Sequence, residues 1–175
     1  MSGGMELKKI LVYIFILALI SVAFSAKFRL GLTGDFPIYT LESTPSTASM
    51  RGVQMDFVLI SPGNVQMGFG LGYENVSTDA SFLGVPVDHS IEMYSVASFK
   101  SEVSSTFDLL VISRGGMAVP NHDFSLSGYF VEVSANLIYY FKWLYLTVGM
   151  SLKSYAFGDA AVTFIPVKFG LGGEY

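Results

Sequence analysis

Cysteine is absent from this sequence of 175 residues, and its absence excludes several kinds of chemistry at once. Without a thiol the chain can form no disulfide, no thiolate metal site and no cysteine nucleophile. Basic residues are also few, because ten Lys and Arg stand against fourteen Asp and Glu and give a formal net charge of −4. A nucleic-acid partner is therefore not expected, since binding phosphates requires a basic surface.

Long apolar runs are missing beyond the N-terminus, although apolar residues make up 51% of the chain. A membrane-spanning helix needs about 20 consecutive apolar residues, whereas a membrane β-barrel places an apolar residue at every second position of segments of about ten. A helix over residues 131–150 is the competing hypothesis, but it would put Glu132 and Asn136 within the bilayer at a high free-energy cost. The composition thus favours a β-barrel.

The N-terminal segment has the features of a secretory signal peptide. Two lysines precede an apolar run over residues 10–20, and the small residues Ala23 and Ser25 then suit a signal peptidase. An uncleaved anchor helix is the alternative, but the run is shorter than the ~20 residues that a spanning helix needs. We predict a helical signal peptide over residues 1–25 and one mature domain over residues 26–175.

From residue 27 onward, apolar and polar residues alternate with the period of two that is typical of β-strands. In the segment 129–141, for example, Val133 and Leu137 share one face while Glu132 and Asn136 share the other. The pattern predicts an all-β fold, an eight-stranded antiparallel up-and-down transmembrane β-barrel. The predicted strands cover residues 27–34, 53–59, 65–74, 90–100, 105–114, 129–141, 144–152 and 167–175.

A three-residue turn over residues 61–63 is expected between the second and third strands, because Pro-Gly suits such a turn. This length brings the apolar faces of both strands to the same side. It predicts the pairs Leu59 with Val65 and Phe57 with Met67.

A two-residue turn over residues 142–143 is expected between the sixth and seventh strands. It sets Glu132 directly opposite Lys153 on the inner face, where an unpaired charge would be costly, so we predict an ion pair between them. Pro166 lacks an N–H donor and is expected at a bulge or at the beginning of the last strand.

The apolar face of each strand is expected to face lipid, and the polar face to fill the lumen. Eight strands enclose an interior just wide enough for side chains, so no open pore is expected. Gly68, Gly70 and Gly72 fall on the inner face and are expected to make room for large neighbours. The charged residues predicted to form a polar network inside the barrel are Arg29, Asp56, Glu74, Glu132, Lys153, Lys168 and Glu174.

The connections between the predicted strands alternate in length. Long or moderate connections follow the first, third, fifth and seventh strands, at about residues 35–49, 77–89, 115–125 and 156–161, and short ones follow the others. Barrels of the bacterial outer membrane combine an even strand number with short periplasmic turns and longer outer loops. The order therefore predicts a bacterial outer-membrane location, with both ends of the barrel chain in the periplasm.

In this alternation of strands and connections the chain resembles the small outer-membrane barrels of the OmpA-domain and OmpX type. The resemblance implies a porin-like barrel of the cell envelope that is closed rather than open. Such a barrel would be a monomer in contact with outer-membrane lipid. It also implies recognition of the last strand by the outer-membrane assembly machinery, which reads a final aromatic residue and alternate apolar positions before it. The matching residues are Val167, Phe169, Leu171 and Tyr175, whereas Gly173 departs from the pattern.

Three functions are compatible with this architecture. The favoured one is a structural or surface-interaction protein that displays four outer loops, with no catalytic residue and no cofactor. A lipid-modifying enzyme, a hydrolase or acyltransferase with a rim site, is the first alternative, and His122 with Asp123 and Ser125 would be its candidate residues. A soluble lipocalin-like carrier with an apolar interior is the second. His89 and His122 are expected in separate outer loops, where too few ligands gather for a metal site.

Overall fold

The computed structural model describes residues 27–33, 49–77, 88–142, 144–157 and 160–173. The strands are β1 (Lys27–Thr33), β2 (Ser49–Ile60), β3 (Val65–Ser77), β4 (His89–Glu102), β5 (Phe107–Pro120), β6 (Gly128–Phe141), β7 (Leu144–Phe157), β8 (Ala160–Phe164) and β9 (Val167–Gly173), with one short 3-10 helix, η1 (Phe124–Leu126). The predicted signal peptide lies outside the described residues. Within the described residues, no helix has the length and apolarity needed to cross a membrane.

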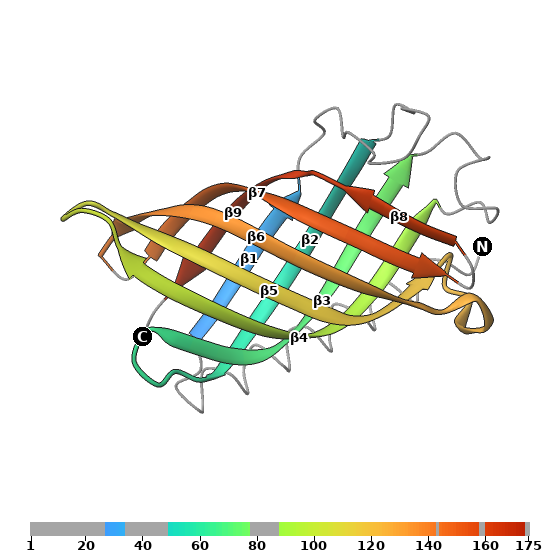
Figure 1. Ribbon diagram of the computed structural model, residues 1–175, viewed down its shortest axis with the longest axis horizontal. Helices are drawn as coiled ribbons and strands as arrows, with labels where there is room; N and C mark the ends of the chain where they lie inside the picture. Colours follow the sequence, from blue (N-terminus) through green and yellow to red (C-terminus); the bar gives the residue numbers. More distant parts are fainter. Residues whose placement is uncertain (1–26, 34–48, 78–87, 143, 158–159, 174–175) are drawn as a thin grey trace, which may run out of the picture.

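The strands form one closed antiparallel barrel (Figure 1). Each strand pairs with its neighbour in sequence from β1 to β7, and β9 joins β7 to β1. β8 and β9 pair with successive parts of β7, so together they act as one eighth strand that is interrupted near Pro166. The predicted all-β fold and up-and-down order of eight antiparallel strands are thus confirmed.

Burial alternates along the strands with the period that the sequence predicts. Side chains of β6 alternate between buried and exposed from Gly128 to Tyr139. Glu132 and Asn136 are buried, whereas Val133 and Leu137 are exposed on the outer surface. Successive side chains of a strand point to opposite faces, so polar residues collect inside the barrel and apolar residues outside it.

The register between β6 and β7 is the predicted one. Phe141 lies opposite Leu144, which leaves a two-residue turn, and Glu132 lies opposite Lys153. Pro166 falls between β8 and β9, as expected of a residue that cannot donate to the ladder. Its carbonyl oxygen still accepts a hydrogen bond of 3.0 Å from the N–H of Ser151.

The predicted register between β2 and β3 is wrong. Phe57 lies opposite Phe69 and Ile60 lies opposite Met67, with a register shift between Val58 and Ile60. Leu59 is therefore the extra residue of a β-bulge, and the turn contains four residues, 61–64. A bulge adds one residue to one strand, and an alternating pattern alone does not reveal such an insertion.

The predicted end of the fifth strand at residue 114, with a loop over residues 115–125, is also wrong. β5 continues to Pro120, and the connection to β6 covers residues 121–127. The glycine pair at 115 and 116 suggests a turn, but Gly116 lies inside the strand and faces β4. A Cβ there would lie 2.1 Å from the carbonyl oxygen of Met93, so glycine permits a close approach of two strands.

The connections lie at two ends of the barrel, which we call the turn end and the loop end. The turn end carries residues 61–64, 103–106 and 142–143, together with the beginning of β1 and the end of β9. Of the described residues, the loop end carries Asp88 and residues 121–127, together with the ends of β1, β3 and β7 and the beginnings of β2, β4, β6 and β8. The long-short alternation holds for the first three pairs of connections, but β7 extends to Phe157 and leaves only two residues before β8.

Two adjacent glycines of β5 provide a test of this packing. Gly116→Ala should lower the free energy of unfolding by about 1–3 kcal/mol, because the new methyl group collides with the backbone of β4. Gly115→Ala is the matched control and should change it by less than about 0.5 kcal/mol, since the nearest atom lies 3.9 Å away. Denaturant unfolding followed by circular dichroism measures both, and equal effects would contradict the observed close approach.

Candidate functional site

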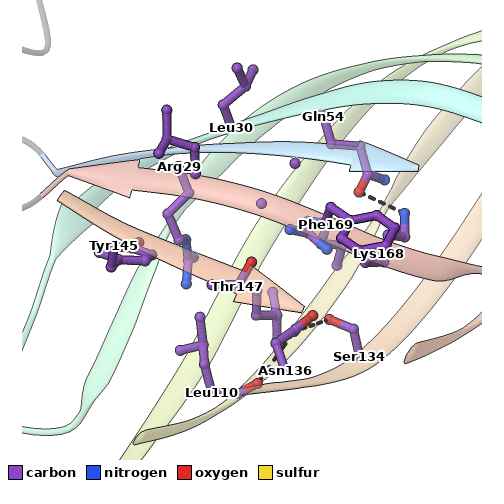
Figure 2. Close-up of a pocket in the computed structure, with 15 residues that line it drawn as sticks. Arg29, Leu30, Gln54, Leu110, Ser134, Asn136, Tyr145, Thr147, Lys168 and Phe169 are labelled. Atoms are coloured by element: carbon purple, nitrogen blue, oxygen red, sulfur yellow. Dashed lines mark hydrogen bonds between the residues drawn. The ribbon is translucent and has the colours of Figure 1, made fainter. Parts of the chain in front are cut away.

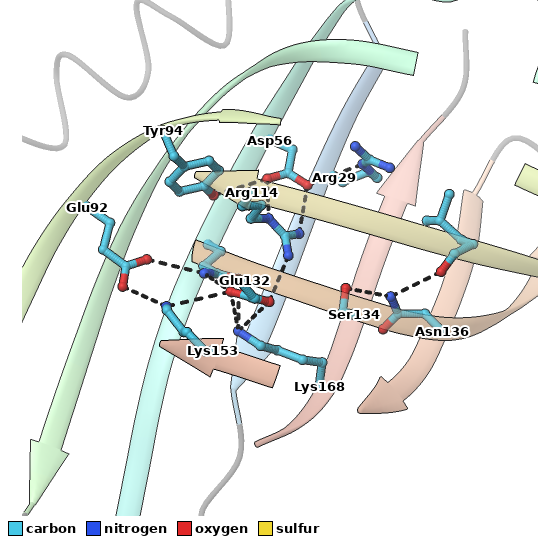
Figure 3. Close-up of polar contacts among 12 residues, drawn as sticks. Arg29, Asp56, Glu92, Tyr94, Arg114, Glu132, Ser134, Asn136, Lys153 and Lys168 are labelled. Atoms are coloured by element: carbon cyan, nitrogen blue, oxygen red, sulfur yellow. Dashed lines mark hydrogen bonds and ion pairs between the residues drawn. The ribbon is translucent and has the colours of Figure 1, made fainter. Parts of the chain in front are cut away.

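Charged side chains from all around the barrel meet in its lumen (Figure 3). We call this group the central charge cluster. No member exposes more than 5% of its surface, and β1 to β7 and β9 each contribute one residue. The members are Arg29, Asp56, Glu74, Glu92, Arg114, Glu132, Lys153 and Lys168. Four are basic and four are acidic, so their formal charges cancel.

Arg114 joins two carboxylates of the cluster. Its Nε and Nη2 donate to the two oxygens of Asp56 at 3.0 and 2.8 Å, and its Nη1 donates to Glu132 Oε1 at 3.0 Å. Paired hydrogen bonds of this kind between guanidinium and carboxylate are among the strongest in proteins. Tyr94 donates its hydroxyl to Asp56 Oδ1 at 3.0 Å, and Arg29 Nε lies 3.3 Å from Asp56 Oδ2.

Lys153 lies among three carboxylates. Its Nζ is 2.6 Å from Glu92 Oε1, 3.1 Å from Glu74 Oε1 and 3.6 Å from Glu132 Oε2. The same nitrogen lies 4.9 Å from the ring centroid of Phe130, within the range of a cation–π contact. The predicted ion pair with Glu132 is therefore present, but Glu92 is the closer partner.

Lys168 contacts two of the carboxylates that surround Lys153. Its Nζ donates to Gln54 Oε1 at 2.9 Å and lies 3.3 Å from Glu132 Oε1 and 3.6 Å from Glu74 Oε1. Gln54 in turn donates to Glu132 Oε2 at 2.9 Å. The cluster is thus one continuous network rather than a set of isolated pairs.

Six of the seven residues predicted to line the lumen meet in this cluster, and the seventh, Glu174, lies outside the described residues. The prediction omitted Glu92 and Arg114. Glu92 alternates with Ile91 and Met93, so the sequence pattern already places it on the inner face. The sequence pattern predicts Arg114 as the last residue of its strand, whereas β5 extends to Pro120 and places Arg114 in the middle of the barrel.

Three residues of the predicted assembly signal lie in β9 on its outer side. Phe169 and Leu171 are exposed and Val167 is partly exposed. Tyr175 lies outside the described residues.

A small cavity lies beside the cluster, toward the seam between β1 and β9 (Figure 2). Gly31 pairs with Gly170 at this seam, so no side chain projects inward from either position. The space open to the centre of a water molecule is about 30 Å³, which suits one or two waters. Pockets for organic ligands commonly hold about 300–1,000 Å³, so this cavity does not suit an organic cofactor.

The predicted rim residues His122, Asp123 and Ser125 lie at the loop end in the connection between β5 and β6. Asp123 Oδ1 accepts hydrogen bonds from the hydroxyl and the N–H of Ser125, at 2.6 and 2.9 Å, and so caps η1. These bonds from Ser125 hold the pKa of Asp123 below its usual value. The Ser125 hydroxyl donates to this carboxylate rather than to an imidazole, and a carboxylate of lowered pKa is a weak general base.

His122 instead lies beside His89, with His122 Nδ1 3.3 Å from His89 Nε2. The sequence separates these two side chains by a whole hairpin, and their proximity was not predicted. Among the residues that the structure describes, no group of three or more His, Cys, Asp or Glu side chains is arranged to hold a metal ion.

Closed strand pairing with a charged interior defines the protein as an eight-stranded antiparallel β-barrel. No family model and no curated protein matches the chain. One solved structure that matches is described as "De novo design of transmembrane beta-barrels". It is 11% identical, with a TM-score of 0.45, and the match covers 85% of this chain and 95% of that chain. The likeness concerns the fold alone.

Removal of one cation should reveal how strongly the cluster depends on charge balance. Lys153→Met removes the cation that lies 2.6 Å from Glu92 and 3.1 Å from Glu74 and should lower the free energy of unfolding by about 3–5 kcal/mol. Lys142→Met, in the exposed turn between β6 and β7, is the matched control and should change it by less than about 0.5 kcal/mol. Similar stabilities for both variants, measured by denaturant unfolding, would show that the cluster contributes little.

Proposed function

We propose that the chain is a transmembrane β-barrel of the bacterial outer membrane that acts as a closed, monomeric scaffold for its outer loops. Its role is structural or one of surface interaction. The observation that carries the proposal is the reversed polarity of the molecule. Glu132 and Lys153 are fully buried, whereas Leu137 and Val148, opposite each other on β6 and β7, are 49% and 47% exposed.

Exposed apolar side chains extend around the barrel and are not confined to one side of it. Every strand from β2 to β7 contributes, and β9 continues the surface toward β1. Soluble monomers rarely expose a contiguous apolar patch of more than a few hundred Å². The residues that form this surface include Val53, Met67, Phe69, Met93, Phe99, Val131, Val133, Leu137, Leu146, Val148, Met150, Leu152, Phe169 and Leu171. Lipid is the solvent that suits such a surface.

The dimensions of the strands suit a bilayer. A transmembrane β-strand needs about 9–11 residues at a tilt of about 45°, and β2 to β7 have 12 to 14 residues each. Exposed aromatic residues lie toward both ends of the outer surface, with Tyr139 and Phe141 near the turn end and Tyr73 and Tyr129 near the loop end. Aromatic girdles at these two levels are typical of outer-membrane barrels.

The filled lumen supports a barrel without an open pore. On the loop side of the central charge cluster, aromatic residues pack together, with Phe130 between Tyr94 and Tyr155. On the turn side, Leu110 and Ile138 are almost fully buried. A scaffold that displays loops needs no channel through its lumen, so the filled lumen supports the favoured function.

The two alternatives receive less support. A lipocalin-like carrier needs an apolar interior with room for a ligand, whereas this lumen contains eight paired charges and a small cavity. A lipid-modifying enzyme with a rim site needs a nucleophile beside an effective general base, and Ser125 is hydrogen-bonded to Asp123, a carboxylate whose lowered pKa makes it a weak base. Replacement of His122 or His89 without effect on lipid A acylation would remove the enzyme hypothesis.

The assembly and location of the protein follow from the same proposal. The three described residues of the predicted signal, Val167, Phe169 and Leu171, would be read by the outer-membrane assembly machinery during insertion. Separation of inner and outer membranes tests the location. Recovery of the protein in the aqueous fraction without detergent would overturn the proposal, and so would a gel mobility that boiling leaves unchanged.

An arginine on the outer surface distinguishes a lipid-facing barrel from a soluble one. Met150→Arg, near the middle of β7, should lower the free energy of unfolding in lipid vesicles by about 2–4 kcal/mol, because the charge enters the bilayer midplane. A soluble barrel would tolerate this exposed substitution within about 0.5 kcal/mol.

Val103→Arg is the control for the arginine experiment. Val103 is 63% exposed in the turn between β4 and β5, outside the region assigned to the bilayer. Its free energy of unfolding should stay close to that of the parent protein. Equal and small effects of the two arginines in vesicles would argue against a lipid-facing surface.

A further inference from the structure

Two histidines that are 33 residues apart in sequence meet at the loop end of the barrel. His89 is the first residue of β4, and His122 lies in the connection that follows β5. Their facing nitrogens, Nε2 of His89 and Nδ1 of His122, are 3.3 Å apart, and their ring centroids are 4.4 Å apart. His122 is exposed and His89 is partly exposed, so solvent reaches the pair.

The connection between β5 and β6 holds His122 in place through Asn121. The N–H of Asn121 donates to the carbonyl oxygen of His89 at 2.9 Å, and its side-chain Oδ1 accepts from the N–H of Asp88 at 3.0 Å. Asn121 and His122 both adopt left-handed conformations, with φ of 50° and 59°. Such values are uncommon for residues other than glycine, although Asn and His adopt them more often than most.

The ring of His89 also contacts a residue of a third segment. Tyr73 of β3 stacks on it with a centroid distance of 5.7 Å and an interplanar angle of 24°. The two imidazoles are therefore presented together by three segments, β3, the beginning of β4 and the 121–127 connection. A pair held in this way loses little conformational freedom when it binds a ligand.

The distance between the two nitrogens suits a metal ion. Two imidazole nitrogens bound to one tetrahedral zinc at about 2.0–2.1 Å are about 3.3 Å apart. We propose that His89 and His122 together bind a divalent transition-metal ion such as Zn²⁺ or Cu²⁺ at the outer rim of the barrel. Zn²⁺ and Cu²⁺ are the ions that imidazole ligands suit, whereas Mg²⁺ and Ca²⁺ prefer oxygen ligands.

Metal binding replaces the contact between the two rings without changing their charge. One of the two facing nitrogens carries a proton when the neutral rings are hydrogen-bonded to each other. On binding, that proton moves through solvent to the second nitrogen of the same ring, and both facing nitrogens donate their lone pairs to the ion. Asp88 and Asp123, each adjacent in sequence to one histidine, carry negative charge at the same end of the barrel.

Two protein ligands leave further coordination positions of the ion to water or to an external ligand. The site is therefore an open one at the rim. The sequence places His89 and His122 in different loops, so it predicts too few ligands for a metal site. The structure brings the two rings together and so supplies two ligands at one place.

The composition simplifies a metal-binding test, because the chain contains two histidines and no cysteine that could bind the ion elsewhere. Untagged, membrane-extracted protein in detergent is titrated with ZnCl₂ at neutral pH by calorimetry, and with CuCl₂ by electron paramagnetic resonance. One ion per chain is expected, with nitrogen hyperfine structure in the copper spectrum.

Substitutions at the pair decide between binding and a purely structural contact. His89→Ala and His122→Ala should each weaken binding by at least about tenfold, the lower range of loss seen when a metal ligand loses its supporting partner. His122→Gln keeps a polar side chain that can hydrogen-bond but should also lose the nitrogen signal. Asn64→Ala, in the turn at the opposite end, is the control and should bind like the parent protein.

Three results would overturn the proposal. The first is no binding by the folded parent protein up to millimolar metal. The second is binding that persists in the double variant His89→Ala/His122→Ala, which would assign the ion to carboxylates. The third is an unchanged affinity in His122→Gln. Heat-dependent gel migration of each variant establishes that the barrel is folded before its affinity is compared.

Discussion

The structure depends on the mutual neutralisation of charges inside a closed barrel. A carboxylate or an ammonium group that leaves water costs several kcal/mol unless an opposite charge and hydrogen bonds replace its hydration. The central charge cluster meets this requirement with one residue from each of eight strands, four of them basic and four acidic. Lys153 of β7 reaches Glu74 of β3 across the lumen, a contact that exists only when the sheet is closed. Charge pairing and barrel closure therefore require each other.

The same cluster also makes strand register important. A slip of one residue would turn every inward side chain of a strand to the outside. For β6 it would move Glu132 and Asn136 to the apolar surface and bring Val133 and Leu137 among the charges of the other strands. Glycines adapt the inner wall to the large residues of the cluster and its surroundings. A Cβ at Gly70 would lie 2.2 Å from the ring of Tyr94, so the predicted role of the inner glycines holds for this position.

Strand faces were predictable from the sequence because alternation is a local property. It was enough to place Glu132 opposite Lys153, since one short turn relates β6 to β7. The bulge at Leu59 and the passage of β5 through Gly116 were not predictable, because both depend on how a neighbouring strand approaches. The contacts of Lys153 with Glu74 and Glu92 required knowledge of barrel closure, so the site was predicted as a list of residues rather than as a network.

The pairing of charges inside the barrel also limits where an external ion can bind. Each cation of the central charge cluster has a carboxylate within 3.3 Å, so an external ion that entered would have to displace an internal contact at a desolvation cost. Groups at the loop end carry no such cost, because His122, Asp88 and Asp123 are already in contact with solvent. The interior cations are thus paired with the barrel's own carboxylates, whereas at the rim the tertiary fold brings together His89 and His122, which alternation along single strands does not relate.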